Sequence, residues 1–234
     1  MHTAHPGQPE SAVGARTTTR LRTLVAVASA AALVAALAWA VAVELDAVLD
    51  VDRAVSDALY AGDDRSRLVE VALQVATAPG LSVFRGVVYL AALGWLAVRR
   101  AWWTAAWMFC TWALIGPLTT ALKEFVDRQR PQFAEGGARY ETLSYPSGHC
   151  SGVAALVTVG LLVAWPLLAP AARRAWLAAG IALVLLVGLT RIWLGVHFLT
   201  DVVGGWALGV GWALLVALAF DALPGGRAAL RPRT

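Results

Sequence analysis

The segment from Thr190 to Asp201 carries an arginine, a histidine and an aspartate between two long apolar runs. Ionisable groups at the boundary of a bilayer are costly to keep, so these three are candidates for function. If residues 197–201 are helical, His197 and Asp201 lie on one face of one turn. A carboxylate at that spacing can hold one imidazole tautomer and leave the other ring nitrogen free to act as a nucleophile. The structural alternative is a pair that only caps the start of a helix.

A second polar segment begins with Lys123 and continues to Arg130 and Pro131. The lysine offers a compact point charge, whereas the planar guanidinium offers a fork that suits phosphate oxygens. The structural alternative is that both side chains extend toward lipid headgroups from the end of a membrane helix. Taken alone, this segment therefore indicates an anion site or an interfacial anchor.

The sequence Tyr145-Pro-Ser-Gly-His149 closes the same polar segment just before another apolar run. The Ser147 hydroxyl can donate a hydrogen bond, and Gly148 lets the backbone approach a ligand closely. Backbone N–H groups at a helix start point toward anions, and His149 adds a titratable group beside them. The structural alternative is that Pro-Ser-Gly forms an ordinary turn before a helix.

The composition is that of a membrane protein. Of the 234 residues, 59% are hydrophobic and 15% are charged, against about 25% charged in ordinary soluble domains. Apolar runs of about 20 residues, long enough to span a hydrocarbon core, recur along most of the chain. We therefore predict an all-α, polytopic membrane protein. No basic stripe with interleaved aromatic residues indicates a nucleic-acid partner. Cys110 and Cys150 belong to no disulfide or zinc pattern.

The apolar runs predict six membrane spans in one membrane domain of residues 23–223. The predicted spans cover residues 23–43, 81–98, 101–122, 150–168, 175–194 and 201–223. Residues 1–22 are predicted to be a disordered cytoplasmic tail, and residues 224–234 a basic cytoplasmic tail. The first span also resembles a signal peptide, but its apolar core is longer than usual, so we expect an uncleaved helix.

The acidic segment 44–80 is predicted to contain a short amphipathic helix at the membrane surface, because apolar residues recur there at helical spacing. Those residues are Leu68, Val71, Ala72 and Val75. The sequence leaves the role of this segment open, and a lid over the site is one hypothesis.

The distribution of lysine and arginine predicts the orientation. With the N-terminus in the cytoplasm, ten of the 19 lysines and arginines fall inside, and every cytoplasmic connection is short and basic. Those ten are Arg16, Arg20, Arg22, Arg99, Arg100, Arg173, Arg174, Arg227, Arg231 and Arg233. This topology places residues 44–80, 123–149 and 190–201 together on the outer face.

The three polar segments then form one predicted site. Lys123, Arg130 and Arg191 are three cations, and they lie beside two histidines and one carboxylate. Three cations around a site imply a phosphate-like dianion as the ligand. Two histidines allow one nucleophile and one acid.

The same residues resemble the three-part signature of the type 2 phosphatidic acid phosphatase family. The matching patterns are Lys123-x6-Arg130-Pro131, Pro146-Ser-Gly-His149 and Arg191-x5-His197-x3-Asp201. The resemblance covers roughly residues 20–223, and it implies a helical-bundle core like that of vanadium-dependent haloperoxidases. Thr190 departs from the pattern, because many members have serine before the arginine. It keeps the hydroxyl group.

The resemblance also implies a role for each motif residue. His197 would attack phosphorus to give a phosphohistidine while Asp201 orients its ring, and His149 would protonate the leaving group. The implied phosphate ligands are Lys123, Arg130, Ser147, the Gly148 N–H and Arg191. Phosphoryl transfer depends mostly on positioning and charge stabilisation. Because fixed cations would supply that charge, we predict no metal or other cofactor, full activity in EDTA, and a bell-shaped pH profile.

The predicted function is hydrolysis of a lipid phosphate or diphosphate at the outer face of the cell membrane, with membrane lipids as the other partners. A polyprenyl diphosphate is the first choice of substrate, and phosphatidylglycerophosphate and phosphatidate stay open. A lipid phosphotransferase with the same intermediate is a close alternative, and a haloperoxidase or a non-catalytic lipid-binding protein is a more distant one. Nothing in the sequence indicates the oligomeric state.

Overall fold

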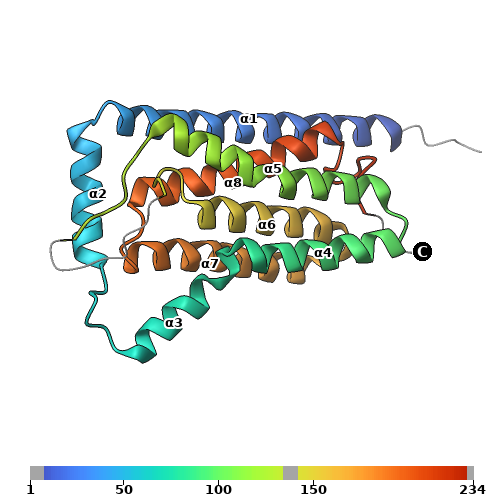
Figure 1. Ribbon diagram of the computed structural model, residues 1–234. Coiled ribbons are helices and arrows are strands. Elements are labelled where there is room, and N and C mark those ends of the chain that lie inside the picture. Colours follow the sequence, from blue (N-terminus) through green and yellow to red (C-terminus); the bar gives the residue numbers. More distant parts are fainter. Residues whose placement is uncertain (1–7, 134–141, 231–234) are drawn as a thin grey trace, which may run out of the picture.

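The computed structural model describes residues 8–133 and 142–230 of the chain, and these residues are largely helical (Figure 1). The elements in chain order are α1 (Gln8–Ala42), α2 (Asp46–Leu59), α3 (Arg67–Thr77), the 3₁₀ turn η1 (Ala78–Gly80), α4 (Ser82–Val98), α5 (Trp102–Val126), α6 (Gly148–Ala164), the 3₁₀ turn η2 (Trp165–Leu167), α7 (Pro170–Trp193) and α8 (Leu199–Ala219). The predicted all-α class is confirmed.

Five helices in the described part of the chain are long and apolar enough to cross a membrane, and they belong to α1, α5, α6, α7 and α8. The sixth candidate is a bent pair, in which α3 with η1 meets α4 at 44°. By itself α4 has 17 residues and is about 25 Å long, which is short for a hydrocarbon core of about 30 Å. The predicted second span therefore reaches full length only together with the preceding surface helix.

The predicted N-terminal tail differs from the structure. Helix α1 already begins at Gln8, so residues 8–22, which were expected to be disordered, are helical, while residues 1–7 lie outside the described residues. Arg16 and Arg20 both form ion pairs with Asp221, just beyond the end of α8, at 3.3 and 2.8 Å. These ion pairs attach the N-terminal part of α1 to the residues after α8. The composition of residues 8–22 alone does not indicate this contact.

Two other helices are longer than predicted and include charged residues that were expected in loops. Helix α5 continues to Val126, so Lys123 lies in its last turn rather than in the following loop. Helix α7 begins at Pro170, and Arg173 therefore lies in its first turn rather than in a connection. Proline suits this first helical position, because it lacks the N–H that would have no helical partner there.

Helix α6 lies inside the bundle, where it packs closely against α8. Gly205 and Gly209 of α8 make this possible, because an added Cβ atom would lie 2.7 Å from the Ser147 carbonyl oxygen and 2.1 Å from that of Ser151. The small-xxx-small spacing of these glycines thus marks a real close approach between the two backbones. This contact fixes the start of α6 beside the start of α8.

Helices α2 and α3 lie at one end of the bundle, with α2 running across it (Figure 1). Asp52 and Ser56 of α2 are buried against the bundle, whereas Leu68, Val71 and Val75 of α3 are exposed. An apolar face exposed on a short helix fits the predicted position at the membrane surface. The ends of α5 and α7 and the starts of α6 and α8 lie at this same end.

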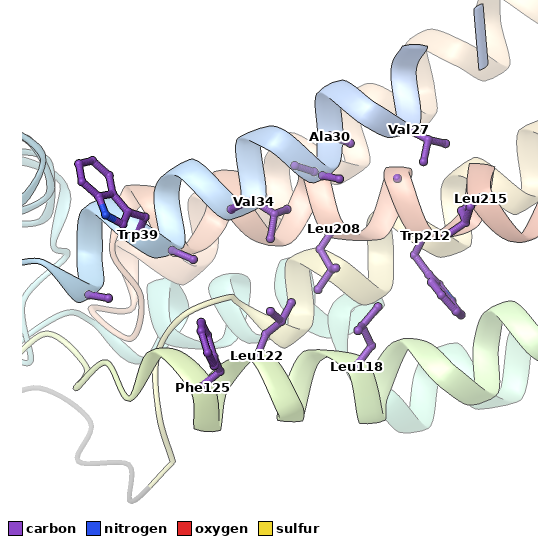
Figure 2. A pocket seen from close by; sticks show the side chains of 16 residues that line it. Val27, Ala30, Val34, Trp39, Leu118, Leu122, Phe125, Leu208, Trp212 and Leu215 are labelled. Atoms are coloured by element: carbon purple, nitrogen blue, oxygen red, sulfur yellow. The ribbon is translucent and has the colours of Figure 1, made fainter. Parts of the chain in front are cut away.

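An apolar groove of about 680 Å³ runs between α1, α5 and α8 (Figure 2). In Figure 2, Leu118, Leu122 and Phe125 of α5 point into it, opposite Val34 of α1 and Leu208 of α8. Since all of its lining side chains are hydrophobic, we expect lipid chains to fill it in the membrane.

Candidate active site

His197 lies in the short connection between α7 and α8, so the condition that residues 197–201 are all helical is not met. The connection turns at Gly195, whose φ of +66° favours glycine. A Cβ atom at Gly195 would also lie 2.7 Å from the rings of Tyr60 and Phe133, which stack on each other. The backbone N–H of His197 then donates to the Arg191 carbonyl at 3.3 Å, so the histidine is tied to the end of α7.

The His197 ring is held from both sides. Its Nδ1 atom lies 3.3 Å from Asp201 Oδ2 and 3.3 Å from Ser144 Oγ, and its Nε2 atom lies 3.2 Å from Arg130 Nη1. A carboxylate accepts a hydrogen bond from Nδ1–H, and a guanidinium can only donate one to Nε2. These partners select the tautomer with a lone pair on Nε2, and the Nε2 atom is therefore the nitrogen available to attack an electrophile.

His197 is also kept neutral. Burial lowers its pKa to about 3, because the charged imidazolium would lose its hydration, and the Arg130 and Arg191 cations oppose protonation further. The Asp201 carboxylate acts in the opposite direction, but Arg128 neutralises it at 2.8 Å. A neutral imidazole is the form that a nucleophile requires.

Asp201 is fully buried and belongs to a charge network that includes α2. Its Oδ1 atom accepts from Arg128 Nη1 at 2.8 Å, and Arg128 Nη2 donates to Asp52 Oδ2 at 2.6 Å. Asp52 also accepts the Thr200 N–H at 2.9 Å, which caps the start of α8 from a different helix. Two carboxylates thus share one guanidinium, so that none of the three charges is buried without a partner.

The other Asp201 oxygen, Oδ2, accepts the backbone N–H of Phe198 at 2.9 Å and a hydrogen bond from Ser144 Oγ. Asp201 is the third residue of α8, so its carboxylate reaches back over the helix start. His197 and Asp201, four residues apart, therefore meet because Asp201 caps the start of α8, and not because both lie on one face of a helix. The cap of the structural interpretation is therefore present, and the same carboxylate also lies beside His197 Nδ1.

Arg130 reaches the site from the loop after α5. In addition to its contact with His197, it donates to the carbonyl oxygens of Val196 and Thr142, at 2.8 and 2.7 Å. It also lines a polar pocket of about 640 Å³ near α2. Lys123 donates to the carbonyl oxygens of Leu143 and Ser144, the latter at 2.8 Å, and so holds the loop that carries Ser144.

The Tyr145–His149 segment is anchored to the bundle and begins α6. The Tyr145 hydroxyl donates to the Val34 carbonyl of α1 at 2.7 Å, and the Ser147 N–H donates to the Asp201 carbonyl at 2.9 Å. The Ser147 hydroxyl is buried and forms no hydrogen bond with the part of the chain that the structure describes. Because a buried polar atom normally has a partner, this hydroxyl is suited to bind a ligand.

His149 and Lys123 line a second pocket of about 280 Å³, between α4, α5 and α6. The His149 ring packs directly against η1, where a Cβ atom on Gly80 would lie 2.7 Å from its Cδ2 atom. Arg191, which is buried at the end of α7, donates to Thr77 just before η1 at 3.2 Å. The turn η1 therefore positions an acid candidate and one of the predicted cations.

Thr190 has a structural role. Its hydroxyl is buried and donates to the Val187 carbonyl one turn earlier, at 2.6 Å. A serine could make the same bond, so the departure from the family pattern leaves the site unchanged. Within residues 8–133 and 142–230, no group of three or more histidine, cysteine or carboxylate side chains is placed to hold a metal ion.

Gly80→Ala should lower kcat by about 10- to 100-fold, because the new methyl group would displace the His149 ring from its position. Steady-state phosphate release is the measurement. The matched control is Gly94→Ala in α4, the helix that follows η1. No atom lies within 4 Å of the Cβ position of Gly94, so this variant should keep full activity. Equal activity of the two variants would show that η1 does not position His149.

Comparisons with known proteins identify the family of this chain. A family model described as the PAP2 superfamily matches residues 101–223, which include all three motifs. The chain belongs to the PAP2 superfamily. It is accordingly a multi-pass membrane phosphatase, and its curated relatives in this family act on lipid phosphates.

Two curated relatives match most of the chain. Phosphatidylglycerophosphatase B of Bacillus subtilis is 31% identical over 177 residues, which are 74% of this chain and 85% of that protein. Decaprenylphosphoryl-5-phosphoribose phosphatase of Mycobacterium tuberculosis is 35% identical over 181 residues, or 72% and 91% of the two chains. The crystal structure of a transmembrane PAP2 type phosphatidylglycerolphosphate phosphatase from Bacillus subtilis superposes with a TM-score of 0.72 and 28% identity, and covers 83% of this chain and 95% of that one.

Sequence reasoning missed four residues that the structure brings to the site. Ser144 and Arg128 lie within the polar segments but were assigned no role, and Asp52 and Arg85 lie outside the three motifs. The only signal for Arg85 was its charge within a predicted span, and Asp52 was one of several acidic residues in a surface segment. For none of these four residues does the distance along the sequence predict which residue it contacts.

Proposed function

We propose that this protein hydrolyses a lipid phosphate or diphosphate at the outer face of the cell membrane through a phosphohistidine intermediate. The observation that carries the proposal is the state of His197. Its ring is buried and neutral, Asp201 lies at Nδ1, and Arg130 lies at Nε2, where an attacked phosphate would be. Nucleophile, orienting carboxylate and an adjacent cation are the parts that nucleophilic phosphoryl transfer needs.

In the first step, the Nε2 lone pair attacks phosphorus and the bond to the leaving-group oxygen breaks. His149 donates a proton to that oxygen, and then removes a proton from the water that hydrolyses the phosphohistidine. Inorganic phosphate leaves and His197 returns to its neutral state. The bell-shaped pH profile stays a prediction, because His197 must be neutral while His149 is protonated.

The scissile phosphate would lie between the Arg130 side of His197 and the pocket that His149 lines. Arg130 and Arg191 would neutralise its charge, and the Ser147 hydroxyl would donate to one of its oxygens. The Gly148 N–H, at the first turn of α6, would donate to another. Lys123 would act both as a cation and through the loop that it holds. These fixed cations are why we propose a reaction without a metal or another cofactor.

The substrate that we place first is a polyprenyl diphosphate. One of the similar phosphatases acts on a decaprenyl-linked phosphate, so a polyprenyl tail occurs among substrates of related proteins. The second candidate is phosphatidylglycerophosphate, which the other named relative hydrolyses. The start of α1 and the end of α8 lie at the end of the bundle opposite α2 (Figure 1), which supports a cytoplasmic side there and an extracytoplasmic site.

The test is phosphate release by the purified, detergent-solubilised protein in EDTA. The substrates are a polyprenyl diphosphate, phosphatidylglycerophosphate and phosphatidate. We expect release from at least one of them without added metal. Activity that EDTA abolishes would contradict the metal-free reaction. Product that forms only when an alcohol or sugar acceptor is added would instead identify a phosphotransferase.

A further inference from the structure

Arg85 of α4 is a cation inside a predicted membrane span and outside the three motifs. Its Nη1 atom donates to the carbonyl oxygens of Gly80 and Gly148, at 2.7 and 3.0 Å. The guanidinium lies against Gly152 of α6, where a Cβ atom would be 1.6 Å from Nη1. The space beside α6 is therefore occupied by this side chain, and the arginine is built into the fold.

The charge of Arg85 is not neutralised by the protein. Throughout residues 8–133 and 142–230, no carboxylate lies within ion-pair distance of it, in contrast to Arg128 with its two carboxylates. Carbonyl oxygens satisfy hydrogen bonds but do not cancel a charge. A half-buried cation within a span is costly, so its usual reason is an anion that it binds.

The pocket beside Arg85 shows where that anion would be. Arg85 lines the 280 Å³ pocket together with Lys123, His149 and Gly148. Leu81, just before α4, and Ile115 of α5 are among its other lining residues. Arg130, in contrast, lines the polar pocket near α2. Arg85 thus lies on the His149 side of the site, while Arg130 lies on the side of the nucleophilic nitrogen.

We propose that Arg85 binds a second phosphate group of the substrate, the one that links the scissile phosphate to the lipid tail. This inference rests on the proposed function, in which His149 protonates the leaving-group oxygen. A pocket lined by that acid receives the leaving group, and an uncompensated cation there selects a leaving group that is itself anionic. The preferred substrates are therefore lipids with a diphosphate, or with a phosphodiester next to a terminal phosphate, and not simple monophosphates.

The experiment compares two pairs of substrates with the same tail. Phosphatidylglycerophosphate is paired with phosphatidate, from which it differs by a glycerol phosphate. A polyprenyl diphosphate is paired with the polyprenyl monophosphate, from which it differs by the second phosphate alone. For Arg85→Gln, we expect kcat/KM to fall by about 10- to 100-fold on the substrate with two phosphates in at least one pair, and by less than about threefold on its monophosphate partner. Arg85→Lys, which keeps the charge but loses the planar fork, should fall between the wild type and Arg85→Gln.

The ratio within a pair is insensitive to the amount of folded protein, so it stays informative if Arg85→Gln is less stable. The matched control is Arg173→Gln. Arg173 also donates to a carbonyl, that of Trp165 at 3.0 Å, but it lies near the start of α7, whereas the site lies at the end of that helix. This variant should leave both ratios unchanged. Equal losses on both members of each pair, or no loss at all, would overturn the inference while leaving the proposed function in place. A wild-type protein that is inactive on each of the four substrates would overturn both the inference and the proposed function.

Discussion

We expect His197→Ala to lower the rate of phosphate release by roughly 10⁴-fold or more, because the variant loses the atom that would form the covalent intermediate. The neutral Nε2 atom has no replacement at this position, since the only other histidine within residues 8–133 and 142–230 is His149, which the proposal uses as the acid. The measurement is kcat for the best substrate of the panel, with the wild type and the variant purified in parallel. The wild type should also become labelled by a substrate with a radioactive phosphate, and the variant should not.

Ser144→Ala is the matched comparison for this variant. Ser144 contacts both His197 and Asp201, but it contributes one hydrogen bond to each and takes no part in bond formation. Its loss should lower kcat by only about tenfold. If His197→Ala kept more than one tenth of the wild-type rate, His197 would not be the nucleophile, and the covalent mechanism would be wrong.

The second large effect concerns stability. Arg128→Met should destabilise the folded protein by about 3–5 kcal/mol, because it leaves the fully buried carboxylates of Asp52 and Asp201 without a counter-charge. Phosphate release should fall as well, since Asp201 then no longer has a fixed orientation beside His197. Thermal or denaturant unfolding of the detergent-solubilised protein gives the loss of stability.

Arg53→Met is the control for Arg128→Met, because Arg53 also pairs with an aspartate of α2 but does so in solvent. The Arg53–Asp50 pair has side chains that are 60% and 71% exposed, so its loss should cost less than about 1 kcal/mol. Adding Asp52→Asn to Arg128→Met removes one of the two uncompensated charges, and should recover part of the stability. Similar losses in Arg128→Met and Arg53→Met would contradict a network that depends on burial.

The sequence by itself determined the class of the protein and predicted which groups would react. Apolar runs of membrane length allow only helices in a chain of this kind, since every backbone polar group in a bilayer must be satisfied within the segment. The charged residues that interrupt those runs are few and costly, and for that reason Lys123, Arg130, His149, Arg191, His197 and Asp201 could be recognised as one site. What identified them was their chemical type and their place at a span boundary, and both are properties of the sequence.

Only the tertiary structure decided how these groups are held. Asp52 and Thr200 are 148 positions apart, yet two hydrogen bonds between them cap α8 and connect α2 to the helix that carries Asp201. No periodicity predicts such a contact, because it depends on how two separately formed helices pack. The same holds for Arg85, whose partners are carbonyl groups of η1 and α6. Backbone carbonyls have the same chemistry at every position, so the sequence carries no sign of which ones a buried arginine meets.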